Sequence, residues 1–202
     1  MRRRIHGIFC LETDWWNDFN RSSTVKPVLK LLSQGVRSQV PFVHRDIGTR
    51  EEFEHYCGKW RQGNGSKYPI LYLAFHGEPT CIHVGDGRRS NHKVSLDELA
   101  ELLGSGLNGR IAFFSSCSTL ATDRRNIDRF LRNTGLVAVA GYKQHVDWLY
   151  SSVFEVIFME SVLRYPLNLA GARRVKEAIR SEHGPMSRSL DFRMVVRQGR
   201  AS

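Results

Sequence analysis

Short apolar runs bounded by turn-forming residues recur along the chain. The run from Tyr68 to Phe75 and the run that leads from Arg110 to Cys117 are both of this kind. Such runs are typical of strands that are buried on both faces of a sheet. The pattern predicts further strands at 5–11, 39–47, 81–84, 136–142 and 192–196, the last of them at an edge. Pro41 indicates an edge position or a strand start for 39–47, because proline cannot donate a hydrogen bond to the ladder.

Between these runs, apolar residues recur at helical spacing. The pattern predicts helices at 22–34, 49–60, 95–103, 123–133, 148–164 and 170–182. Thr49 with Glu52 and Ser95 with Glu98 have the spacing of capping boxes, which mark helix starts. Three glycines mark helix ends: Gly35, Gly104 and Gly135. Strands that alternate with amphipathic helices predict an α/β fold, a mostly parallel sheet with helices on both faces.

Two of the predicted strands end in groups that carry chemistry. The strand at 68–75 is followed by His76 and Gly77, and a short strand at 81–84 with a turn and loop at 85–91 is expected to form a hairpin that projects from it. The next long strand leads to Cys117 among small hydroxyl residues. Ligands bind beyond the carboxyl ends of parallel strands, so the thiol and the imidazole form a candidate nucleophile and base. Three other histidines compete for the role of the base: His83, His92 and His145.

Other thiol chemistries fit the surroundings of Cys117 less well. A hydrolase nucleophile elbow needs glycine two residues before and after the nucleophile, where this chain has Ser115 and Thr119. A phosphatase loop of the Cys-x5-Arg kind needs arginine at 123, where the residue is Asp123. Zinc sites need histidine and cysteine ligands at short spacing, and the sequence has no such cluster. We therefore predict no metal and no cofactor.

Length and composition bound the remaining possibilities. With 202 residues, the chain can form one substantial core, and we treat 1–202 as a single domain. The four cysteines have no Cys-x-x-Cys spacing, so reduced thiols are expected rather than disulfides. The longest apolar stretch, 148–159, contains polar residues and is too short to span a membrane. The sequence therefore predicts a soluble cytoplasmic protein that has no contact with a membrane.

The formal charge of +10 is unevenly distributed. Arg2, Arg3 and Arg4 supply three positive charges, and the C-terminal portion from residue 164 holds nine basic and three acidic residues. This excess is compatible with a solvated basic face or with a surface for nucleic acid or an acidic partner. The solvated face is favoured, because no aromatic-interleaved or helix-turn-helix pattern accompanies the charge.

The sequence after Cys117 adds a family resemblance. It holds a polar helix, Gly135, a strand ending in Ala-Gly-Tyr at 140–142, and Val-Asp-Trp at 146–148. Together with His76-Gly77 and Cys117, this order resembles the caspase-like (clan CD) cysteine peptidases. It is closest to the CHAT branch, the relatives of separase and caspase found largely in bacteria. The resemblance covers a catalytic core at about 68–165 and leaves 166–202 as a basic C-terminal portion.

The resemblance implies a three-layer caspase-like fold and a role for each site residue. His76 would be the general acid and base, and Cys117 the nucleophile. The backbone N–H groups of Gly77 and Cys117 would form the oxyanion hole. The implied function is a cysteine endopeptidase that cleaves a protein or peptide substrate and is regulated by a partner or by dimerisation. The alternative is a catalytically silent caspase-like module that binds a protein or nucleic-acid partner.

Three acidic residues suggest a substrate preference. The predicted topology brings Glu12 and Asp14, after the first strand, and Asp147, after the strand at 136–142, to the same edge as Cys117. Relatives that place acids in such loops cleave after arginine or lysine, since a charged substrate side chain needs an opposite charge in its pocket. We therefore expect cleavage after a basic residue. Asp147 is equally well explained as the N-cap of the helix that begins at Trp148.

Overall fold

A six-stranded sheet forms the centre of the molecule. The computed structural model describes residues 6–16, 20, 23–34, 39–63, 66–85 and 92–199. The strand order in the central sheet is β2-β1-β3-β7-β8-β9. These strands are β1 (Ile8–Glu12), β2 (Phe42–Asp46), β3 (Ile70–Ala74), β7 (Ile111–Ser115), β8 (Ala138–Tyr142) and β9 (Phe192–Val196). All neighbours are parallel except β8 and β9, which are antiparallel, so the prediction of a mostly parallel sheet is confirmed.

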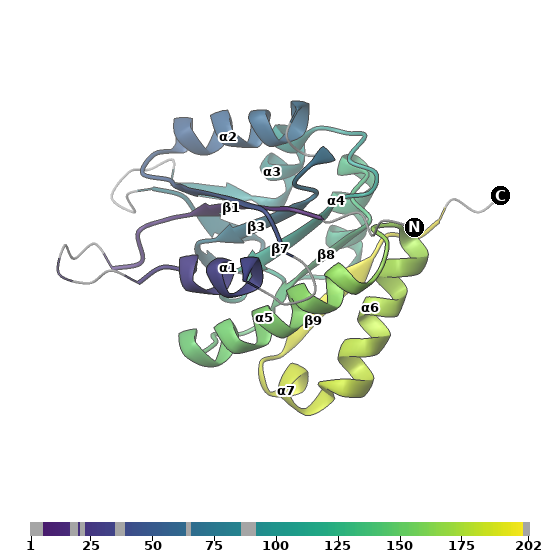
Figure 1. The fold of residues 1–202 in the computed structure, drawn as a ribbon. Coiled ribbons are helices and arrows are strands. Elements are labelled where there is room, and N and C mark those ends of the chain that lie inside the picture. Colours follow the sequence, from purple (N-terminus) through teal and green to yellow (C-terminus); the bar gives the residue numbers. More distant parts are fainter. Residues whose placement is uncertain are drawn as a thin grey trace.

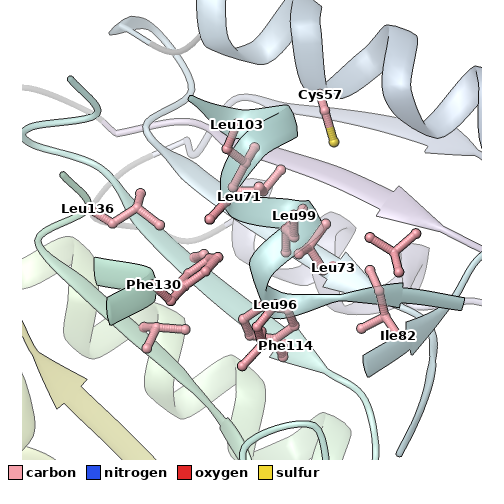
Figure 2. Close-up of a cluster of buried hydrophobic side chains, with 14 of the residues drawn as sticks. Cys57, Leu71, Leu73, Ile82, Leu96, Leu99, Leu103, Phe114, Phe130 and Leu136 are labelled. Carbon is pink, nitrogen blue, oxygen red and sulfur yellow. The ribbon is translucent and has the colours of Figure 1, made fainter. Parts of the chain in front are cut away.

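Helices cover both faces of this sheet (Figure 1). They are α1 (Lys26–Ser33), α2 (Arg50–Gln62), α3 (Leu96–Leu103), α4 (Arg124–Thr134), α5 (Trp148–Arg164), α6 (Leu169–Glu182) and α7 (Gly184–Ser189). Strand side chains alternate between the two faces. Leu71 and Leu73 of β3 pack with α2, α3 and α4, as Figure 2 shows for part of this cluster. Ile70 and Tyr72 pack on the other face with α1, α5 and α6. The result is a three-layer α/β fold.

Local sequence signals explain most element boundaries. Both capping boxes are present, at the starts of α2 and α3. Gly135 ends α4 with a φ of 79°, a left-handed conformation that glycine adopts without steric cost. The first helix begins at Lys26, later than predicted, and the expected stop at Gly35 lies outside the described residues. The six-residue helix α7 was not predicted.

The chain that leads from the predicted strand at 68–75 to His76 forms two separate strands. β3 ends at Ala74, and His76 begins a separate three-stranded antiparallel sheet, β4 (His76–Glu78), β5 (Cys81–His83) and β6 (Lys93–Ser95). β5 pairs with β6 on one side and with β4 on the other, so the hairpin expected after His76 is present, and none of its described residues pairs with β3. Both catalytic candidates lie just beyond the carboxyl ends of the adjacent parallel strands β3 and β7. No described helix is both long and apolar enough to cross a membrane.

Candidate active site

Gly77 is packed against the turn that contains Cys117. A Cβ atom at position 77 would lie 2.3 Å from Thr119 Oγ1, 2.6 Å from the Cys117 carbonyl oxygen and 3.0 Å from Ser116 Cβ. Only a residue without a side chain allows this approach. The His76-Gly77 motif and the Cys117 turn are therefore in direct contact. The His76 residue is exposed, and the Cys117 residue is half-buried.

Hydrogen bonds fix the turn around Cys117 on both sides. The backbone N–H of Ser118, which has a φ of 58°, donates to the Gln144 carbonyl at 3.2 Å. The Thr119 hydroxyl donates to the Cys81 carbonyl at 3.1 Å and lies 2.7 Å from Ser116 Oγ. The turn is thus tied to the loop after β8 and to the β4-β5 hairpin, which gives the thiol a defined position.

The His76 ring is held by the backbone of the loop after β1. Its Nε2 atom lies 2.8 Å from the carbonyl oxygen of Trp15, and the two aromatic rings pack edge to face at 5.2 Å. A carbonyl oxygen only accepts hydrogen bonds, so Nε2 carries a proton and Nδ1 is the basic nitrogen of the neutral ring. Sequence reasoning missed Trp15, because the group that acts is a backbone carbonyl.

Glu12 lies inside the protein, where a substrate cannot reach it. The residue is 1% exposed. Its Oε1 atom accepts from Trp15 Nε1 at 2.7 Å and from the Val25 N–H at 2.8 Å. Its Oε2 atom accepts from the Thr24 hydroxyl and lies against His44 Nε2, both at 2.6 Å. Burial would raise the pKa of Glu12, but hydrogen bonds from His44, Thr24 and Trp15 outweigh it and lower the pKa. We therefore remove Glu12 from the expected substrate-binding residues.

The other two acids remain on the surface. Asp14 is exposed, and its Oδ1 atom accepts a weak hydrogen bond from the Trp16 N–H at 3.3 Å. Asp147 is the N-cap of α5, because its Oδ1 atom accepts from the Tyr150 N–H at 2.8 Å. The N-cap interpretation is thus confirmed. Since the residue is exposed, capping does not remove its charge from the surface.

A buried carboxyl group lies beneath the strand ends. Glu155 of α5 is 1% exposed, and its Oε1 atom accepts from Ser115 Oγ at 2.8 Å and from the Tyr142 hydroxyl at 3.1 Å. Its Oε2 atom accepts from the Tyr72 hydroxyl. Burial raises the pKa of Glu155 to about 7, although the three hydroxyl groups lower it. The group joins β3, β7 and β8 near Cys117. The only signal in the sequence is an acid within an apolar helix.

The remaining thiols are poorer nucleophile candidates. Cys10 and Cys57 are buried, and burial raises the pKa of both thiols. Cys81 is half-buried, and burial, followed by the negative charge of Glu78, raises its pKa. A raised pKa lowers the fraction of thiolate, which is the nucleophilic form.

The competing histidines lie elsewhere. His83 pairs with His76 across the β4-β5 ladder, and its Nε2 atom lies 3.5 Å from a Glu78 carboxylate oxygen. Burial lowers the pKa of His83. His92, directly before β6, packs edge to face on His83 at 5.2 Å. His145 is exposed in the loop before α5. Only His76 adjoins the glycine that contacts the Cys117 turn.

One group of three possible metal ligands occurs among the described residues. It consists of Glu12, His44 and Asp46. The first two are already joined by the hydrogen bond at 2.6 Å, and the side chain of Asp46 is 86% exposed. The donors around Glu12 occupy its oxygen atoms, so this group is better explained as a hydrogen-bonded cluster than as a metal centre.

The basic residues of the C-terminal portion fall into two groups: some hold the fold together, and others are exposed. Arg193 donates to the carbonyl oxygens of Leu120 and Thr122, and Arg197 donates to the Leu136 carbonyl. These two arginines connect β9 to the rest of the fold. Four basic residues of α6 are exposed: Arg173, Arg174, Lys176 and Arg180.

Comparison with known proteins agrees with this fold. No protein with a curated description matches the sequence. Among solved structures, the crystal structure of caspase-1 from Spodoptera frugiperda is similar, with a TM-score of 0.53 and 12% sequence identity. The match covers 96% of this chain and 87% of that chain. At this identity the similarity shows the fold alone, and it confirms the predicted caspase-like architecture. A family model described as a family of unknown function (DUF6642) matches residues 6–196, and the chain therefore belongs to that family.

Proposed function

We propose that this protein is a cysteine endopeptidase, a member of the CHAT branch of the caspase-like enzymes, with Cys117 as nucleophile and His76 as general acid and base. The observation that supports the proposal most strongly is the contact between Gly77 and the Cys117 turn. It packs the backbone next to the exposed His76 against the turn that carries the half-buried Cys117, beyond the carboxyl ends of β3 and β7. Substrates of parallel α/β folds bind at this edge.

The hydrogen bond to Trp15 suggests how the proton moves. With Nε2–H donated to the Trp15 carbonyl, Nδ1 of His76 is available to accept the thiol proton. The Cys117 thiolate then attacks the peptide carbonyl carbon and forms a tetrahedral intermediate. Nδ1–H of the imidazolium protonates the leaving amine, which leaves a thioester on Cys117. Water, deprotonated by His76, hydrolyses the thioester and releases the free thiol. The Trp15 carbonyl also stabilises the imidazolium cation.

Two backbone N–H groups suit the role of the oxyanion hole. Among the described residues, none accepts a hydrogen bond from the Cys117 N–H. In the β4-β5 ladder, Glu78 and Cys81 close a two-residue turn, so Gly77 and Ile82 form the next pair. Hydrogen-bonded and non-hydrogen-bonded pairs alternate, which directs the Gly77 N–H out of the ladder. Donors of this kind stabilise the negative charge that develops on the substrate oxygen.

The surface charges favour a basic side chain before the scissile bond. Asp14 follows β1 and Asp147 follows β8, and both are exposed on loops at the carboxyl ends of the strands. The hydrogen bonds of Asp14 and Asp147 described above use Oδ1 of each residue and do not involve Oδ2. An exposed carboxylate can pair with an arginine or lysine of a substrate. We propose these two residues, without Glu12, as the acids of the substrate pocket.

A second candidate function rests on the start of α5. Four large apolar residues are exposed there: Trp148, Leu149, Tyr150 and Val153. Aromatic side chains are enriched where proteins bind other proteins. A catalytically silent module would use such residues to hold a protein partner without cleaving it. Nucleic acid, attracted by the basic residues of α6, is the weaker form of this alternative.

The test is cleavage of a defined peptide mixture. The purified protein and its Cys117→Ala and His76→Ala variants are incubated with a proteome-derived peptide library, and new termini are identified by mass spectrometry. We expect new termini with the wild type and none with either variant. Neither residue is buried in the core, so the variants should keep the wild-type melting temperature within a few degrees. Cleavage that persists in Cys117→Ala, or a wild type that binds peptides and cleaves none, would favour the second candidate.

A further inference from the structure

The loop after β1 is anchored to one carboxylate at both of its ends. Trp15, at the start of the loop, and Val25, directly before α1, both donate to Glu12 Oε1. Thr24 donates to the second oxygen, and His44 of the neighbouring strand β2 lies against the same atom. Glu12 is the last residue of β1, within the parallel ladders to β2 and β3. Both described ends of the loop are therefore fixed to the sheet through this side chain.

The same loop supplies the group that holds His76. The Trp15 side chain donates to Glu12 through Nε1, and the Trp15 carbonyl accepts from His76 Nε2. The Thr13 N–H donates to the Ala74 carbonyl at 3.0 Å, which continues the ladder between β1 and β3 toward this contact. A continuous series of contacts thus leads from His44 through Glu12 and Trp15 to the base.

We propose that Glu12 is a positioning residue that acts through Trp15 on His76. Its Oε1 atom fixes the Trp15 indole, which keeps the Trp15 carbonyl within hydrogen-bonding distance of Nε2. This contact selects the ring tautomer with the proton on Nε2 and leaves Nδ1 free to take the thiol proton. The inference rests on the proposed function for its catalytic meaning, but the tautomer of His76 can be measured whether or not the protein cleaves peptides.

Two single substitutions separate positioning from general stability. Trp15→Phe keeps an aromatic ring beside His76 and keeps the backbone carbonyl, but removes the N–H that Glu12 holds. Thr24→Val removes a hydrogen bond of similar length to the other oxygen of the same carboxylate, and leaves Trp15 unchanged. Both variants lose one hydrogen bond to Glu12, and Thr24→Val also loses the acceptor for the Lys26 N–H at 3.1 Å, so the control should lose at least as much melting temperature as Trp15→Phe.

The readout is the pair of ring-nitrogen resonances of His76 in protein labelled with ¹⁵N-histidine, at a pH where the ring is neutral. For wild type and Thr24→Val we expect a single tautomer with the proton on Nε2. For Trp15→Phe we expect resonances averaged between the two tautomers, and a rate of Cys117 alkylation by iodoacetamide lowered about tenfold. In a peptidase assay, kcat should fall in Trp15→Phe while KM stays within about twofold.

Two results would overturn the proposal. One is a His76 tautomer that is unchanged in Trp15→Phe. The other is an equal loss of the tautomer in Thr24→Val, which would mean that Glu12 supports the fold in general. If Trp15→Phe does not fold, Glu12→Gln and Glu12→Leu replace it, because glutamine keeps an oxygen that can accept from Trp15 and leucine does not. The tautomer should survive in the first and be lost in the second. A wild type with the fixed tautomer but no cleavage would contradict the proposed function and leave this inference standing.

Discussion

The backbone of Gly77 lies so close to Cys117 that a Cβ atom at position 77 would be 2.6 Å from the Cys117 carbonyl oxygen. The second atom in the way, Thr119 Oγ1, is itself held by the Cys81 carbonyl and cannot move aside freely. The contact therefore sets the distance between β4, which carries the proposed base His76, and the turn that carries the proposed nucleophile Cys117.

Gly77→Ala should separate these two segments. We expect it to lower the free energy of unfolding by about 1–3 kcal/mol, because the added methyl group forces backbone atoms apart. Gly58→Ala is the matched control: its Cβ would meet nothing within 4 Å, and it lies inside α2. Alanine is the better helix former, so this control should gain about 0.5–1 kcal/mol. Urea denaturation measures both. Equal effects at the two positions would show that the contact is not as tight as described.

Glu155 should make stability depend on pH near neutrality. Its pKa is about 7 in the folded protein against 4.5 for an unperturbed group, so the folded state favours the protonated form. The resulting stability is fully present below about pH 4.5 and is lost as the pH rises through 7. Relative to wild type, Glu155→Gln should therefore become more stable between pH 5 and pH 8, by up to about 3 kcal/mol.

The comparison at each pH cancels the titration of all groups that the two proteins share. Glutamine keeps an oxygen for Ser115 and Tyr142 and an N–H group for the Tyr72 hydroxyl, so the hydrogen bonds have counterparts in the variant. Urea denaturation at pH 5, 6, 7 and 8 provides the data. A difference in unfolding free energy that stays constant over this range would contradict the assigned pKa.

The sequence predicts the layers of this fold more fully than it predicts the site. Apolar runs and capping boxes locate the sheet and the starts of α2 and α3, because burial and N-caps depend on side chains a few residues apart. The short helix α7 has too few residues to show a periodicity. The division between β3 and β4 at His76 arises from pairing with β5, a contact that no local pattern encodes.

Within the site, too, features set by nearby residues can be predicted, and features set by distant contacts cannot. His76 and Cys117 are recognisable because each follows an apolar run. The motifs that come after them along the chain also have the order seen in caspase-like peptidases. The role of Trp15 depends on a backbone carbonyl, which is the same in every residue type. Glu12 and Asp14 are both acids after one strand, yet one is buried and the other exposed. The sequence alone cannot separate them, because burial here depends on Thr24, Val25 and His44, which are distant in the chain.

Substrate preference tests whether Asp14 and Asp147 lie in the substrate pocket. In a fluorogenic peptide series with Arg, Lys, Asp or Leu before the scissile bond, we expect the highest kcat/KM for Arg and Lys. Asp14→Asn or Asp147→Asn should lower the Arg value about tenfold and leave the Leu value unchanged. Asparagine is as good an N-cap as aspartate, so Asp147→Asn should keep α5 intact and change the charge only. A preference for Asp or Leu, or an Arg preference that survives both substitutions, would exclude these residues from the pocket.

The most direct test of a catalytic pair formed by Cys117 and His76 is the rate at which each cysteine is alkylated. The reagent is a peptidyl arginine ketone that carries a leaving group on the carbon next to the carbonyl. Peptide mass mapping assigns the modified thiol, and the Cys117→Ala variant provides the background. We expect Cys117 to react at least about a hundredfold faster than Cys10, Cys57 and Cys81, and to lose most of that rate in His76→Ala. A Cys117 that reacts no faster than Cys81, or that reacts equally fast without His76, would contradict a catalytic pair at this site.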